Sequence, residues 1–110
     1  MSKEVKKGNT IEVDINLEFT GTVRNYSILI ESQYVPTTND KAQKHPVKLD
    51  GDPIQIKANF IGVKGSVIKK FEVVINEKKW KIEDIIFKYE EIEVNIPVPY
   101  ADFDLKQIAA

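Results

Sequence analysis

Residues 10–20 read TIEVDINLEFT, and every second side chain in this stretch is apolar. The apolar set is Ile11, Val13, Ile15, Leu17 and Phe19, with acidic or amide side chains between its members. Successive side chains of an extended strand point to opposite faces, so this segment has one apolar face and one charged face. A helix would scatter the same residues around its circumference and bury carboxylates. The stretch therefore predicts a strand in a sheet that is packed on one side only.

Similar segments return along the chain at intervals of about ten residues. The further strand candidates are 23–32, 47–49, 54–60, 71–75, 80–89 and 91–98. No segment has the pattern of an amphipathic helix of three turns. The pattern therefore predicts an all-β fold, a single-domain antiparallel β-sandwich of immunoglobulin-like size. A small β-barrel is the alternative, because strand patterns do not show whether a sheet closes on itself.

Local signals add detail to this prediction. The short link at Gly21 predicts an antiparallel hairpin between the first two long strands. The alternation slips near Asp84, which predicts a bulge or bend there. Pro97 and Pro99 have no N–H to give to a ladder, so the last strand is predicted to be an edge strand or to end there.

Composition favours one soluble globular domain. The chain has 110 residues, of which 42% are hydrophobic and 30% charged, and its formal net charge is −1. It has no cysteine, which excludes disulfides, thiolate zinc sites and a thiol nucleophile. With no secretory signal and no apolar run of about 18 residues, a cytoplasmic protein without a membrane partner is expected. The near-neutral charge gives no reason to expect a nucleic-acid partner.

The two ends of the chain differ in character. Residues 1–9 are polar and are predicted to form a flexible N-terminus, followed by the sandwich domain at 10–99. Residues 100–110 form a C-terminal tail that keeps Tyr100, Phe103, Leu105 and Ile108. Because an exposed apolar tail lowers solubility, we expect the tail to dock on its own domain or on a partner.

No group of residues predicts catalysis. His45 is the one histidine of the chain, and it stands before a proline in a polar stretch. The acidic pairs, such as Asp50 with Asp52, match no dedicated calcium loop. The sequence therefore predicts no catalytic residue, no metal site and no cofactor, and the chain is not expected to be an enzyme.

Charges are segregated along the second half of the chain. Seven lysines lie between Lys57 and Lys81, and seven acids lie between Glu83 and Asp104. Neighbouring strands that place lysines opposite glutamates would explain this balance, and we favour that interpretation. The alternative is a basic nucleic-acid-binding patch around Trp80. Trp80 itself is interpreted as a core residue.

The remaining hypothesis is a non-enzymatic binding module that acts through protein–protein contacts. Microbial or viral immunity proteins, inhibitors and accessory structural proteins are of this kind. Residues 33–46 form the longest irregular stretch, and such loops often carry binding surfaces. The predicted binding residues are Tyr34, His45, Tyr100 and Phe103, since aromatic side chains dominate contact energies. A carbohydrate- or small-ligand-binding sandwich is the alternative function, and a homodimer is a possible assembly.

Overall fold

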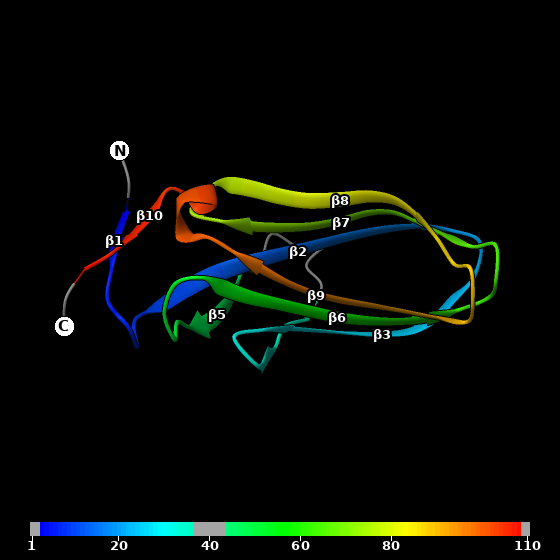
Figure 1. The fold of residues 1–110 in the computed structure, drawn as a ribbon, viewed down its shortest axis with the longest axis horizontal. Helices are drawn as coiled ribbons and strands as arrows, with labels where there is room; N and C mark the ends of the chain where they lie inside the picture. Colours follow the sequence, from blue (N-terminus) through cyan, green and yellow to red (C-terminus); the bar gives the residue numbers. More distant parts are fainter. Residues whose placement is uncertain (1–2, 37–43, 109–110) are drawn as a thin grey trace.

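The computed structural model describes residues 3–36 and 44–108 and shows two four-stranded antiparallel sheets packed face to face (Figure 1). The first sheet has the order β5 (His45–Lys48), β2 (Thr10–Thr20), β7 (Val67–Ile75) and β8 (Lys78–Ile86). The second has the order β4 (Gln33–Tyr34), β3 (Val23–Ile30), β6 (Ile54–Gly62) and β9 (Glu91–Val98). A 3₁₀ helix η1 (Tyr100–Phe103) and a two-stranded parallel sheet of β1 (Lys3–Val5) and β10 (Leu105–Gln107) follow at one end.

This arrangement confirms the predicted β-sandwich. No ladder joins the two large sheets among the described residues, so they do not close into a barrel. The alternation of β2 has the predicted consequence, because Ile11, Val13, Ile15 and Leu17 are all buried between the sheets. Asp84 has φ +54°, in agreement with the predicted irregularity, and β9 is an edge strand as its prolines indicated.

The predicted hairpin between the first two long strands is wrong. β2 pairs with β5 and β7, whereas β3 pairs with β4 and β6, so the link at Gly21 crosses from one sheet to the other. Each of these strands carries its own apolar face, and after the crossing both faces still point into the core between the two sheets. Gly21 adopts φ +88°, a conformation that glycine takes without steric cost.

A chain of aromatic rings joins the two layers. Phe60 of β6 and Phe71 of β7 are fully buried, and their ring centroids lie 5.7 Å apart in an edge-to-face arrangement. Phe19 packs against Phe60, and Trp80 packs edge-to-face against Phe71. Trp80 is only partly buried, because it lies on the edge strand β8 rather than in the centre of its sheet.

The two long sides of the sandwich differ. On one side the Gln33 side-chain amide donates to the Lys48 carbonyl at 2.7 Å and accepts from the Lys48 N–H at 2.9 Å, which ties β4 to β5. On the other side β8 and β9 are the edges of their sheets, and within the described residues no hydrogen bond joins these two strands. The side between β4 and β5 is therefore closed by these hydrogen bonds. We call the side between β8 and β9 the open side.

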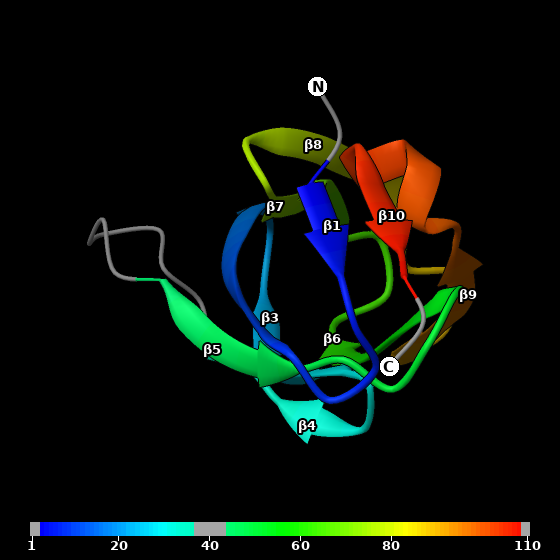
Figure 2. The ribbon, with the colours of Figure 1, turned by 90° about the vertical axis from the view of Figure 1, so that its left-hand side faces the viewer.

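The two ends of the chain meet beyond the sandwich. Residues 1–9 are predicted from the sequence to be flexible, and in the structure Lys3–Val5 pair with Leu105–Gln107 (Figure 2). The Lys3 N–H donates to the Asp104 carbonyl, and the Ile108 N–H donates to the Val5 carbonyl, both at 2.8 Å. Tyr100, Phe103 and Leu105 are buried, so the tail docks on its own domain here.

The stretch 33–46 is less irregular than predicted where it is described. Gln33 and Tyr34 form β4, Val35 is buried, and His45 begins β5. Residues 37–43, the middle of the predicted loop, lie outside the described residues. Pairing of β4 with β3 and of β5 with β2 extends the sheets into both ends of the stretch, a long-range effect that local polarity does not reveal.

Replacing Leu105 by alanine tests the docking of the tail. Leu105 is buried, so Leu105→Ala is expected to lower the free energy of unfolding by about 2–4 kcal/mol. Lys106→Ala, at the exposed neighbouring position, is the control and should change it by less than about 0.5 kcal/mol. Urea denaturation measures both values, and equal small effects would contradict a docked tail.

Candidate interaction surface

The four binding residues predicted from the sequence do not lie together. Tyr34 is 60% exposed on the short strand β4, and His45 is half-buried at the start of β5. Tyr100 and Phe103 are 1% and 0% exposed and belong to the core beneath η1. These two side chains are therefore not part of the exposed surface of the described chain.

Exposed apolar side chains gather at the opposite end of the sandwich from the termini. Among the described residues, five large hydrophobic side chains are exposed, and only Tyr34 lies away from this end. The other four are Ile61 at 41%, Val63 at 40%, Ile86 at 58% and Tyr89 at 79% exposed. We call this end, made by residues 20–24, 61–67 and 86–90, the tip (right in Figure 1).

Backbone hydrogen bonds fix the three segments of the tip to one another. The Val63 N–H donates to the Thr22 carbonyl at 3.0 Å, and the Gly65 N–H donates to the Phe87 carbonyl at 2.9 Å. The Phe87 N–H donates in turn to the Ser66 carbonyl at 2.8 Å. The tip is thus part of the rigid scaffold and not a set of separate loops.

The Ser66 hydroxyl adds a further tie. It is buried, accepts from the Thr22 N–H at 2.9 Å and donates to the Thr22 carbonyl at 3.2 Å. Close packing supports the same arrangement, since a Cβ at Gly62 would come within 2.8 Å of the Thr22 carbonyl oxygen and 3.1 Å of the Phe87 ring. Glycine is required there by the close approach of these segments.

The surface of the tip is hollowed on one side. Residues 20–22 and 63–67 line an open depression of about 460 Å³. Three cations, Arg24, Lys64 and Lys88, lie in the tip segments, with Glu90 as the one carboxylate there. The tip segments therefore carry three cations and one carboxylate, although the whole chain has a net charge of −1, and Glu91 stands opposite Ile61 at the start of β9.

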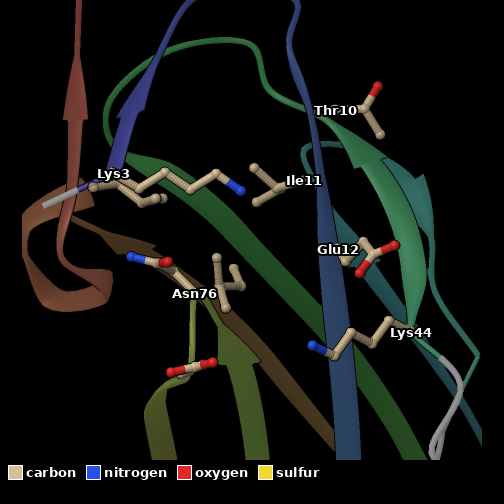
Figure 3. Close-up of a pocket in the computed structure, with 9 residues that line it drawn as sticks. Lys3, Thr10, Ile11, Glu12, Lys44 and Asn76 are labelled. Carbon is tan, nitrogen blue, oxygen red and sulfur yellow. The ribbon is translucent and has the colours of Figure 1, made fainter.

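A second pocket lies at the other end, beside the termini. It has a volume of about 390 Å³, and Figure 3 shows Lys3 and Lys44 entering it from opposite sides. Asn76 lines it and donates to the carbonyls of Phe103 and Asp104, so this amide already holds the tail in place. Two lysines and two glutamates are among the residues that line this pocket. The lining shows no nucleophile paired with a base, so it has no catalytic arrangement.

The described ranges hold neither a metal-binding cluster nor a membrane-spanning helix. No group of three His, Asp or Glu side chains in them is placed to hold a metal ion. No helix of the described chain is long and apolar enough to cross a membrane.

The charged faces agree with the favoured cross-strand interpretation. On the outer face of the first sheet, Glu18 stands opposite Lys70, which stands opposite Glu83 on β8. Glu72 is opposite Lys81 and also accepts from the Asn16 side-chain amide at 3.1 Å. Lysine and acids therefore alternate across β2, β7 and β8 in the row of Lys70, whereas Lys79 stands opposite Val74 and Lys57 of β6 opposite Asn95.

Comparison with known proteins does not identify a relative. No protein-family model matches the chain, and no curated protein and no solved structure matches it significantly.

The sequence does contain a signal for the tip. Phe60-Ile61 and Ile85-Ile86 are apolar pairs in which one residue must point outward from a half-buried strand. Val63 lies in the turn Gly62-Val63-Lys64-Gly65, where a polar residue is usual. These exceptions to the alternation indicate exposed apolar surface, but only the fold shows that they lie at the same end of the sandwich.

Removing the Ser66 hydroxyl tests the rigidity of the tip. Ser66→Ala leaves the Thr22 N–H without this acceptor, while the Thr22 carbonyl keeps the Val63 N–H, and should lower the free energy of unfolding by about 0.5–1.5 kcal/mol. Ser27→Ala, on the outer face of β3, is the control and should cost less than about 0.5 kcal/mol. Chemical denaturation measures both, and equal costs would show that the Ser66 tie has no stabilising effect.

The burial of Tyr100 predicts how the stability of the fold changes at alkaline pH. Burial raises the pKa of the Tyr100 phenol above its ordinary value of 10.0, and the nearby Glu31 carboxylate raises it further, while the Gly51 backbone acts in the opposite direction. Above pH 10 the unfolded phenol loses its proton while the folded one keeps it, so stability is expected to fall as pH rises. The Tyr100→Phe variant should lose less stability between pH 9 and 11 in urea denaturation. Equal losses of stability in the variant and the wild type would show that ionisation of Tyr100 does not cause the loss at high pH.

Proposed function

We propose that the protein is a non-enzymatic binding module that contacts a partner protein through the tip. The observation that supports this proposal is the gathering of Ile61, Val63, Ile86 and Tyr89 on one hydrogen-bonded end of the sandwich. Exposed apolar side chains that are grouped in this way mark interaction sites more often than single ones do. An immunity protein, an inhibitor or an accessory structural protein would use such a surface.

Rigidity of the tip supports tight association. A partner that binds a pre-ordered surface does not have to offset the loss of loop entropy. The ties between Thr22, Val63 and Ser66 hold the apolar side chains in place before any contact is made. Tyr89 is the most exposed of them and is a residue type that is enriched among energetic hot spots.

Charge around the tip specifies the chemistry of the partner. Arg24, Lys64 and Lys88 lie in the same segments as the apolar side chains, so we expect the complementary surface to be apolar with an acidic rim. A narrow end of a molecule measuring 46 × 25 × 21 Å fits a concave surface better than a flat one. We therefore expect the tip to enter a cleft and to block it.

Site-specific photocrosslinking in the native host tests the proposal. A photoreactive phenylalanine at position 89 should give one discrete protein adduct, and adding Val63→Asp should abolish it because a carboxylate disrupts both the apolar contact and the charge match. The same probe at position 57, on the outer face of β6, is the control and should give no discrete adduct. A probe at position 34 compares the tip with the surface predicted from the sequence.

The other outcomes contradict the proposal in distinct ways. An adduct from position 34 but none from position 89 would move the binding surface to β4. No discrete adduct at either position would contradict the binding function itself. Co-sedimentation of the wild-type chain with phosphatidylserine vesicles, lost in Val63→Asp, would make the tip a lipid-binding surface and exclude the protein partner proposed here.

A further inference from the structure

The edge strand β8 leaves apolar side chains incompletely covered. Trp80, Ile82 and Ile85 face the inside of the sandwich but are only partly buried, unlike Phe71, Val73 and Ile75 on the neighbouring strand β7. On β9, across the open side, Ile92 and Ile96 are partly buried as well. An additional strand along β8 would cover this apolar seam and would pair with the unpaired edge of the strand.

Charges along β8 are arranged so that the strand complements itself. Lys78, Lys79 and Lys81 stand in its first half, and Glu83 and Asp84 stand in its second half. Asp84 already pairs with Lys69 at 3.2 Å. Lys81 and Glu83 contact each other at 3.2 Å but remain 51% and 50% exposed, so both retain surface for a second partner.

We propose that a second copy of this chain pairs with β8 in antiparallel orientation, centred on Ile82. In this register Lys81 stands opposite Glu83 of the second copy, and the two-fold symmetry repeats the pair. Ile82 meets its own equivalent over the apolar seam. Within residues 80–84, moving the register by two residues in either direction brings Lys81 onto Lys81 or Glu83 onto Glu83, and the register centred on Ile82 is the one that pairs opposite charges there.

The other free edge of the open side does not suit such a pair. Glu91 and Glu93 stand on the outer face of β9 and would face each other in a two-fold pair centred on Ile92. Pro97 removes one backbone donor from the same strand. At its beginning β8 is adjacent to η1, so the pairing uses its central residues, 80–84. The short overlap predicts a dimer that forms at high concentration.

Antiparallel pairing has a consequence for the tip. The tip lies at the end of β8, so two antiparallel β8 strands place the two tips at opposite ends of the dimer (Figure 1). The dimer would then present two binding surfaces that point away from each other. The proposed dimer rests on β8 alone and stands whether or not the tip binds a partner.

Charge reversal with complementation tests the dimer by sedimentation velocity, from about 1 µM to about 300 µM of the full chain. The wild-type chain should shift from monomer to dimer over this range. Lys81→Glu alone and Glu83→Lys alone should each dimerise at least about tenfold more weakly, because each places like charges opposite each other. An equimolar mixture of the two variants should form a heterodimer, since every apposed pair is then of opposite charge.

Circular dichroism first establishes that both variants fold, and the mixture provides its own control for folding because unfolded chains would not complement each other. Lys57→Glu, on the outer face of β6, is the matched charge reversal and should dimerise like the wild type. A wild-type chain that stays monomeric to the highest concentration would overturn the proposal, as would variants that dimerise normally or a mixture that stays monomeric. Assemblies that keep growing with concentration would also overturn it and would indicate β8 pairing with β9 of the next copy.

Discussion

The contact between Phe60 and Phe71 holds the two layers of the sandwich in register. Each ring is fully buried and comes from the centre of its own sheet, and their edge-to-face packing sets the separation that all the surrounding aliphatic side chains must match. Tyr26 and Trp80 extend the same aromatic chain toward the periphery. Because this contact fixes the spacing of the two layers, the described surface varies in chemistry mainly at the ends and edges of the sheets.

Those ends and edges differ in how they are completed. The terminal end is covered by β1, β10 and η1, and one long side is tied by the Gln33 amide. The tip is tied internally by Ser66 but keeps apolar side chains exposed, and the β8 edge keeps a partly covered apolar seam. Exposed apolar surface is what a partner can bury. Binding energy is therefore available at the tip and along β8, and not at the terminal end or on the side that Gln33 ties.

The sequence predicted the fold better than the site, and the residues show why. Alternation in β2 is a local signal, and burial of Ile11 to Leu17 followed from it directly. The link at Gly21 was predicted to be a hairpin because a short link alone does not show whether the chain turns within a sheet or crosses to the other one. As aromatic residues of a tail, Tyr100 and Phe103 are predicted from the sequence to bind a partner, but their burial depends on contacts with residues far away in sequence. Ile61 and Tyr89 lie at the same end of the sandwich only through the topology of three separate segments.

The proposed function depends on a pre-ordered tip, and amide hydrogen exchange of the free protein tests that order most directly. The N–H groups of Thr22, Val63, Gly65 and Phe87 donate within the tip and should exchange slowly, at rates approaching those of the core strands. Exchange of these four amides at the rate of an unstructured peptide, with the β2 and β7 amides still protected, would show a mobile tip and contradict the account.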